Sequence, residues 1–574
     1  MNIILFSIFK EDYMNFKDFF SQVFSYSQSK NHEFHLSKSQ INEQNLDSEN
    51  ENNKEIKNIF NSIDVNIDYI KTKYNLLINS DIVIREFLLN AKGKQYKALL
   101  LYIDGMVDTQ ILNDFVLRPL ILKNRSNTSD SNRVISEAVT NNITVRKVKK
   151  FNLPDFIISS LLPQNSINKV STFEEAFMGV NSGDCALFID TINVAFDIDV
   201  KGFKQRSIEK PSNETVIKGA QEAFVENIRT NTSMLRRLTN NENLIIENVN
   251  VGKITKTKCA ICYMKNIVNL DLLAEVKYRI NNLDVDSVLS AGQLEQLITL
   301  DNFLGLPKVI STERADNSVK NLLQGKIIII INGSPYALIL PAVFMDFLTS
   351  SEDTNLKPLY SNFLRIIRSI AAFLTLFLPG LYVAITSFHL EIFPTELLFS
   401  IIASRQNVPF PIIFEILIME LSFEIIREAG LRVPSPIGPT IGIVGALVLG
   451  QAAVSADIAS PILIIIVAIA GISSLAIPDY TFGFHLRIYR FVFILLGYIA
   501  GILGIGIGIF IYLSEICDLE SFGVSYTSPY APLSNIKNNS FLLKPIWMRE
   551  NRAEFLKTQK EKSQNHISMK WRNN

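Results

Sequence analysis

The cysteines are the first residues in this sequence whose type and spacing could do chemistry. Cys259 and Cys262 form a C-x-x-C motif, a spacing that binds zinc or supports redox chemistry in other proteins. The motif lies in the stretch 256–264, which reads as a β-strand, and strand alternation would direct the two thiols to opposite faces. No second cysteine pair and no histidine lies nearby, so the motif favours two core thiols over a metal or redox site.

Other catalytic patterns are missing from the sequence. None of its five histidines belongs to a cluster with metal-ligand spacing, and no G-x-x-x-x-G-K-[ST] phosphate loop occurs. We therefore expect a protein that is not an enzyme, with no catalytic, cofactor-binding or metal-binding residues. Basic and acidic side chains number 56 each, so no net charge indicates a nucleic-acid partner.

The most suggestive charged residues lie in the stretch 409–430. A helix at about 100° per residue places Glu420, Glu424 and Glu428 on one face with Arg427, which can pair with Glu424. Carboxylates at membrane depth are costly unless they face water or a partner. Two interpretations remain open: the amphipathic helix lies flat at the membrane interface, or copies of it ring a water-filled path and the acids attract cations.

Small residues four positions apart form a second pattern, in the next apolar stretch. They are Gly438, Gly442, Ala446 and Gly450. On a helix this spacing makes one smooth face against which another helix can approach closely. The pattern predicts either ordinary packing within a bundle or a subunit interface or pore wall.

A multipass α-helical membrane domain, 363–514, must position these residues. A membrane-spanning helix needs about 20 apolar residues. Clear spans of that kind are predicted at 369–388, 433–456, 458–478 and 491–514. Asp457, the one charge between the second and third of these, is the expected tip of a helical hairpin.

The flanking basic residues predict how this domain is oriented. Arg365 and Arg368 precede the first span, and the tail 515–574 ends in a basic stretch, so both flanks are expected on the cytoplasmic side. Two ends on one side require an even number of crossings. Whether 389–430 crosses the membrane twice, re-enters it or lies on it stays open.

The first 345 residues have the composition of soluble protein. We expect a tail at 1–27, a disordered linker at 28–56, and two cytoplasmic α/β (α+β) domains at 57–163 and 166–345. The four cysteines are too few for a disulfide scaffold, and the N-terminal apolar run is too short for a signal peptide.

Two local signals within these domains give specific predictions. A helical pattern at 108–117 should stop before Pro119. Asn332-Gly333 between two β-prone runs indicates a hairpin, although the apolar stretch 327–345 could be mistaken for a membrane span.

The stretches 409–434 and 441–454 resemble the A subunit of the spore germinant receptors, the GerA family. Further similar stretches are 209–231, 312–316, 332–338 and 521–526. The resemblance implies a protein of the dormant spore's inner membrane that acts with a transporter-like B subunit and a lipoprotein C subunit. It also implies that the A subunit forms oligomers in contact with lipid, which provide an ion-conducting or signal-transducing path that triggers germination. The alternative is a non-conducting scaffold that docks the B and C subunits.

Charged residues in or beside the similar soluble stretches are candidates for coupling. They are Glu209, Glu214, Arg229, Arg236, Arg237, Glu313 and Arg314. They predict either ion pairs on and between subunits or a surface that transmits a signal from the soluble domains to the membrane.

Overall fold

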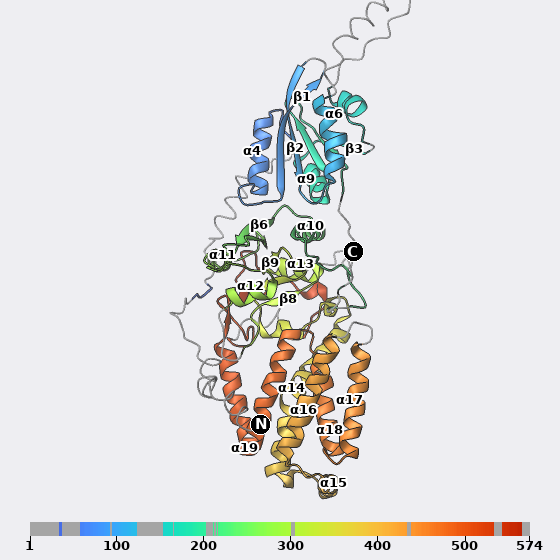
Figure 1. Cartoon of the computed structure of the whole chain (residues 1–574). Coiled ribbons are helices and arrows are strands. Elements are labelled where there is room, and N and C mark those ends of the chain that lie inside the picture. Colours follow the sequence, from blue (N-terminus) through green and yellow to red (C-terminus); the bar gives the residue numbers. More distant parts are fainter. Residues whose placement is uncertain are drawn as a thin grey trace, which may run out of the picture. The chain divides into compact units, whose positions relative to one another are not determined.

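The structure, a computed structural model, is shown in Figure 1. It describes residues 34–36, 58–91, 94–122, 153–164, 166–202, 211, 214, 216–299, 305–432, 438–532 and 542–564. The expected tail 1–27 lies outside the described residues, as does most of the expected linker. Residues Leu36–Asn574 form one compact unit, and the following description concerns that unit.

The first antiparallel sheet has five strands in the order β1-β2-β4-β5-β3. The strands are β1 (Ile82–Ala91), β2 (Lys94–Ile103), β3 (Ile167–Val170), β4 (Cys185–Ile189) and β5 (Ala195–Ile198). Helices α4 (Ile63–Tyr74) and α9 (Phe173–Ser182) pack on one face. The other face is covered by α5 (Thr109–Ile111), the π-helix Leu112–Leu117, α6 (Arg118–Leu122), α8 (Leu153–Phe156) and the π-helix Ile157–Leu161.

This sheet corrects the expected domain boundary at residues 163–166. β4 pairs with β2 as well as with β5, so the strand pair assigned to the second domain belongs to the first sheet. Local sequence predicted the hairpin but could not show which strand would lie beside it. The helix after Asp108 also continues through Pro119, because a π-helical segment precedes the proline and changes the hydrogen-bond register there.

The second antiparallel sheet repeats the same topology, in the order β6-β7-β9-β10-β8. Its strands are β6 (Leu244–Val251), β7 (Thr257–Met264), β8 (Ile310–Thr312), β9 (Ile327–Ile331) and β10 (Ala337–Leu340). Helices α10 (Ile228–Thr239) and α13 (Ala315–Gln324) share one core with it, whereas α11 (Leu270–Asn281) and α12 (Ala291–Ile298) contact β6 and β10. The predicted hairpin around Asn332-Gly333 is confirmed as β9–β10.

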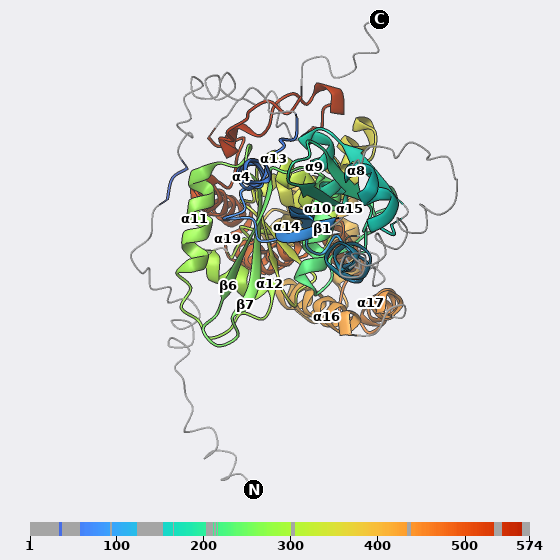
Figure 2. The same cartoon turned by 90° about the horizontal axis from the view of Figure 1, so that it is seen from above.

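A bundle of helices follows the second sheet. It contains α14 (Pro358–Phe388), α15 (Thr395–Arg405), α16 (Ile412–Arg432), α17 (Gly438–Ser455), α18 (Pro461–Leu475) and α19 (Tyr480–Asp518). Asp457 adopts a left-handed conformation between α17 and α18, and Ser460 caps α18 with Pro461 at its first position. The expected tip at Asp457 is therefore confirmed, and α16 and α17 lie side by side in both views (Figures 1 and 2).

Two of the described helices, α14 and α19, are long and apolar enough to cross a membrane by length and composition. α19, however, is not straight, because Ala500 and Gly501 have non-helical backbone angles. His485 hydrogen-bonds Tyr512 at 3.0 Å, although 27 residues of straight helix would separate them by about 40 Å. The chain therefore turns back at Gly501, and the predicted single span 491–514 is wrong.

The segment after α19 returns to the second sheet. β11 (Glu520–Ser521) and β12 (Val524–Ser525) form a short hairpin, and the Ser521 hydroxyl donates to the Lys308 carbonyl at 2.7 Å. Within 542–564, Arg552 donates to the carbonyl of Leu323 on α13 at 2.8 Å. The described part of the expected basic tail is therefore packed against the second sheet domain.

Candidate functional site

Acids of α16 and arginines of α19 meet inside the helix bundle. Glu420 and Glu424 lie one turn apart on α16, and Arg487 and Arg490 lie one turn apart on α19. One Arg490 nitrogen, Nη2, lies 2.9 Å from both Glu420 Oε2 and Glu424 Oε1. Arg427 adds a third cation 3.3 Å from Glu424 and donates to Ser474 of α18 at 2.9 Å. We call these five charged residues the charge cluster.

Burial makes the charge cluster unusual. Glu420 is 0% exposed and Arg490 is 1% exposed. Neither carboxylate oxygen of Glu420 has a hydrogen bond of good geometry, and Nε and Nη1 of Arg490 also lack one. Desolvating an ion pair is costly unless further hydrogen bonds compensate it. The pair is therefore held by the surrounding helices at a cost in stability, and this makes it a candidate for a functional role.

The charge cluster carries more positive than negative groups. Glu424 also faces Arg487, at 3.5 Å, so two carboxylates are opposed by three guanidiniums. The Arg487 guanidinium lies over the Phe484 ring at 5.1 Å, and that contact stabilises the cation further. Within one chain, Glu420 and Glu424 are thus neutralised rather than open to passing cations.

The structure brings together three of the four residues predicted on the acidic face. Glu428 is separate: it is exposed and pairs with Arg432 of its own helix at 2.7 Å. α16 packs against α14, α17, α18 and α19, so it does not lie flat on a surface. The arrangement of several copies around a path remains a hypothesis.

Sequence reasoning missed the arginine partners of the acids. Arg487 and Arg490 lie ahead of the predicted span 491–514 in the sequence, but the structure includes them in α19. Two arginines three residues apart ahead of an apolar run, with unpaired acids elsewhere in the membrane domain, would have indicated the pairing.

Glu415 forms a second buried polar contact at the opposite end of α16. It is 1% exposed, and its Oε1 accepts a hydrogen bond from the Ser460 backbone N–H at 2.6 Å. Arg405 of α15 lies 3.6 Å from its other oxygen. Glu415 therefore joins α15, α16 and the tip that precedes α18.

The small-residue stripe on α17 is described in part. An added Cβ at Gly450 would meet Ile464 of α18 at 3.4 Å, so this end of the stripe packs within the chain. Gly438, Gly442 and Ala446 lie in α17, but their side-chain surroundings fall outside the described residues. A closer approach occurs elsewhere, because a Cβ on Gly497 of α19 would lie 2.5 Å from the Gly380 carbonyl oxygen of α14.

The predicted coupling residues of the soluble domains fall into separate groups. Thr312 donates its hydroxyl to Glu214 at 2.9 Å, and the Glu214 backbone N–H donates to Glu313 at 2.8 Å. Arg314, fully buried, pairs with Asp316 at 2.7 Å and donates to the carbonyls of Glu214 and Ala220. Burial raises the pKa of Glu214 to about 7.

Of the remaining coupling residues, the three that the structure describes lie on α10. Arg229 pairs with Asp104 at 2.6 Å, and Arg236 makes a buried bidentate pair with Asp81, whose oxygens lie 2.8 Å away. Arg237 pairs with Glu222. Glu209 lies outside the described residues. These contacts join chain segments, and they do not form one continuous surface.

The C-x-x-C thiols lie in the core of the second sheet domain. Cys259 and Cys262 are both buried in β7, and only Cys262 faces the core shared with α10 and α13. Burial raises the pKa of both thiols. Among the residues that the structure describes, no group of His, Cys, Asp and Glu could hold a metal ion.

Comparison with known proteins gives consistent matches. Residues 68–555 match the family model described as "Bacillus/Clostridium GerA spore germination protein". The chain is 36% identical over 486 residues to spore germination protein KA of Bacillus subtilis, covering 84% of this chain and 85% of that protein. It is 34% identical over 468 residues to the uncharacterized membrane protein YfkQ of Bacillus subtilis, covering 82% and 86%. A crystal structure of the N-terminal domain of the A subunit of the Bacillus megaterium spore germinant receptor GerK3 is 28% identical, with a TM-score of 0.35, covering 51% of this chain and 99% of that one.

Proposed function

Since this chain belongs to the GerA family of spore germination proteins, we propose that it is the A subunit of a nutrient germinant receptor. It resides in the inner membrane of the spore and acts with a transporter-like B subunit, which takes the nutrient, and a lipoprotein C subunit. Several copies assemble around an ion path that opens when the nutrient binds. No step of this role requires a catalytic residue.

The bundle supports a multipass arrangement with an even number of crossings. Ser460 contacts Glu415 near the start of α16, whereas Ser474 contacts Arg427 near its end, so α16 and α18 run in the same direction. α14, α17 and the first half of α19 run the other way, and the second half of α19 returns. In the proposed topology, both sheet domains and the segment 542–564 lie on one side, and the basic flanks support the cytoplasmic side.

The observation that carries the proposed mechanism is the charge cluster between α16 and α19. Charged groups are retained inside a membrane bundle chiefly where an ion path, a relay or a gate uses them. Glu420 and Arg490 are buried and incompletely hydrogen-bonded, so a relative movement of α16 and α19 would change their pairing with little other loss. The charge cluster then couples nutrient binding to the opening of the path.

The test uses spores in which this chain is the one receptor A subunit of its family. The paired variant Glu420→Gln with Arg490→Gln removes both buried charges and retains similar side-chain volumes. We expect it to assemble but to release potassium more slowly after nutrient is added. The matched control is Glu428→Gln with Arg432→Gln, which removes an exposed pair from α16.

The outcomes separate the receptor role from the mechanism. Spores that lack the chain and still respond to every nutrient as the wild type does would refute the receptor role. Wild-type potassium release by the buried-pair variant, at normal abundance by immunoblot, would refute the charge cluster's part in coupling.

The neutralised acids favour one further candidate, the non-conducting scaffold. Because three guanidiniums face Glu420 and Glu424, a single chain offers no open ring of carboxylates. Purified protein reconstituted in planar bilayers distinguishes the two functions. Steady conductance supports the ion path, whereas silent bilayers with a protein that restores germination in spores support the scaffold.

A further inference from the structure

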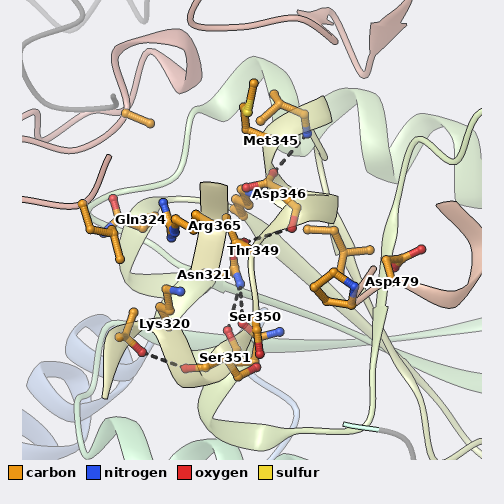
Figure 3. Close-up of a pocket in the computed structure, with 18 of the residues that line it drawn as sticks. Lys320, Asn321, Gln324, Met345, Asp346, Thr349, Ser350, Ser351, Arg365 and Asp479 are labelled. Carbon is orange, nitrogen blue, oxygen red and sulfur yellow. Dashed lines mark hydrogen bonds and ion pairs between the residues drawn. The ribbon is translucent and has the colours of Figure 1, made fainter. Parts of the chain in front are cut away.

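A cavity of about 390 Å³ lies between the second sheet domain and the start of the helix bundle (Figure 3). Its walls come from α13, from the 3₁₀ turns Phe344–Leu348 and Ser351–Thr354, from the first turns of α14, and from the segment 542–556. The volume is within the range of pockets that hold small ligands. Its location is distinct from the charge cluster.

Among the charged side chains that line this cavity, bases outnumber acids. The bases are Lys320, Lys326, Arg365, Lys544 and Arg549, and the acids are Glu214, Asp346 and Asp479. A cavity lined in this way has a positive potential unless the acids neutralise the bases. The contacts of the acids decide whether they do.

Each of the three acids is already engaged. Asp346 pairs with Lys326 at 2.6 Å, and Asp479 accepts the backbone N–H of Phe482 at 2.8 Å as the cap of α19. Glu214 accepts a hydrogen bond from the Thr312 hydroxyl. Burial raises the pKa of Glu214 to about 7, so a fraction of this carboxyl group is neutral at neutral pH. Lys326 therefore neutralises Asp346, whereas Asp479 and the ionised fraction of Glu214 offset only part of the charge of the other cations.

Three cations of the lining have no carboxylate within ion-pair distance among the described residues. These are Lys320 on α13, and Lys544 and Arg549 in the C-terminal segment. Arg365 does have one, Asp353 at 3.0 Å, but Arg368 shares the same carboxylate at 2.8 Å. The positive charge around the cavity therefore exceeds the negative charge that faces it.

Arg365 lies close enough to Lys320 and Arg549 to repel their positive charges. Burial, and then the Arg365 charge, lower the pKa of Lys320 to about 8. Burial and the same arginine lower the pKa of Arg549 below its usual value. Like charges that converge on a cavity cost stability, and a bound anion would reverse that cost.

We propose that this cavity binds a phosphate-bearing anion, held by Lys320, Arg365 and Arg549. Lysine and arginine are the side chains that proteins use most to hold phosphate oxygens. Gln324, one turn after Lys320 on the same face of α13, offers an amide N–H to the same ligand (Figure 3). A tetrahedral dianion can accept from three converging cations, whereas a planar carboxylate is satisfied by one guanidinium.

The phosphate can come from two sources, an anionic lipid headgroup or a free phosphate compound. The cavity adjoins α14 a turn before its uncharged part begins at Ser369, the depth at which headgroups lie. The occupant would join α13, α14 and the C-terminal segment, since each contributes one of the three cations. This role is independent of ion conduction.

The experiment uses the full chain in nanodiscs and measures its thermal unfolding. Inorganic phosphate is titrated against chloride at equal ionic strength in phosphatidylcholine nanodiscs, and a second set contains phosphatidylglycerol. We expect phosphate, phosphatidylglycerol or both to raise the unfolding temperature of the wild type, and Lys320→Met to weaken the effect about tenfold. The matched control is Lys253→Met, at an exposed lysine of the same domain.

Each result supports the inference or overturns it. Stabilisation by phosphate in phosphatidylcholine assigns a free anion, and stabilisation by phosphatidylglycerol alone assigns a headgroup. Without either anion, Lys320→Met should unfold at the same or a higher temperature than the wild type, because a repelled cation has been removed. The site is overturned if the anions raise the unfolding temperature of the wild type and of Lys320→Met equally. It is also overturned if Lys320→Met and Lys253→Met reduce this rise by the same amount.

Discussion

Two Glu–Arg ion pairs of α16 differ in how much they contribute to stability, because one is exposed and the other is buried. Glu428 and Arg432 form an exposed pair on α16, and such pairs contribute at most about 1 kcal/mol. Glu420 and Arg490 form a buried pair at 2.9 Å, and Glu420 has no other ion-pair partner among the described residues. The distance between the charges is similar, so burial decides how strongly each partner depends on the other.

The buried pair predicts a non-additive mutant cycle. Arg490→Gln should lower the free energy of unfolding by about 3–5 kcal/mol, because it leaves Glu420 buried without its ion-pair partner. Glu420→Gln should cost less, because Arg490 still pairs with Glu424 at 2.9 Å. The double variant should lose much less than the sum. Thermal unfolding of the purified protein in detergent checks this, and Glu428→Gln is the matched control. Additive losses would show that the two charges do not depend on each other.

A second residue-scale prediction compares two neighbouring arginines of α10. Arg236 is 2% exposed and makes a bidentate pair with Asp81, which precedes β1, whereas Arg237 pairs with Glu222 in a partly exposed position. Arg236→Ala should destabilise the protein by about 3–5 kcal/mol, and Arg237→Ala by no more than about 1 kcal/mol. Chemical denaturation of the two variants measures the difference. Equal losses of stability would show that the Arg236–Asp81 ion pair does not join the two sheet domains.

At the scale of elements, the backbone geometry of α19 divides the predicted span 491–514 into two helical segments. Hydropathy over 491–514 describes one long apolar helix, but Gly501 has φ +60° and ψ −143°, a conformation that suits glycine alone. Gly504 and Gly508 then let the second half of α19 pack closely on Leu496 and Phe493. Gly504 and Gly508 therefore allow close packing between two halves of one element.

This reversal predicts opposite effects for two alanine substitutions in α19. Gly501→Ala should destabilise the protein by about 1–3 kcal/mol, because alanine is strained at this φ and its Cβ would press on Phe388 and His389 at 3.1–3.2 Å. Gly506→Ala, where nothing lies within 4 Å, should stabilise the helix by about 0.5–1 kcal/mol. Thermal unfolding in detergent compares them. A neutral Gly501→Ala would indicate that α19 is continuous.

At the scale of the whole molecule, the chain returns from the helix bundle to the second sheet domain. The reversal in α19 brings Ser521 to the Lys308 carbonyl and lets Arg552 donate to the carbonyl of Leu323. Phe347 packs with both Tyr526 and Phe482, so one aromatic cluster joins the end of the second sheet domain to α19. Movement within the bundle can therefore reach the second sheet domain without passing through the first.

The proposed topology predicts which positions an impermeant thiol reagent can reach. Of the described cysteines, Cys517 alone is exposed, so a Cys517→Ser background is sufficient. In intact cells, Ala456→Cys at the α17–α18 tip should be labelled, whereas Asn551→Cys and Lys253→Cys should be labelled only after lysis. Labelling of only one of Asn551→Cys and Lys253→Cys in intact cells would refute an even number of crossings.

The sequence by itself determined the local elements, the β9–β10 hairpin at Asn332-Gly333, the tip at Asp457, and the family resemblance. These follow from hydrophobic periodicity and turn chemistry, which act over a few neighbouring residues. The tertiary structure decided that β4 pairs with β2, that α19 folds back at Gly501, and that Arg490 meets Glu420. Each of these contacts is between residues that are tens of positions apart in the sequence. They depend on which surfaces of distant elements pack together, and a local sequence pattern does not contain that information.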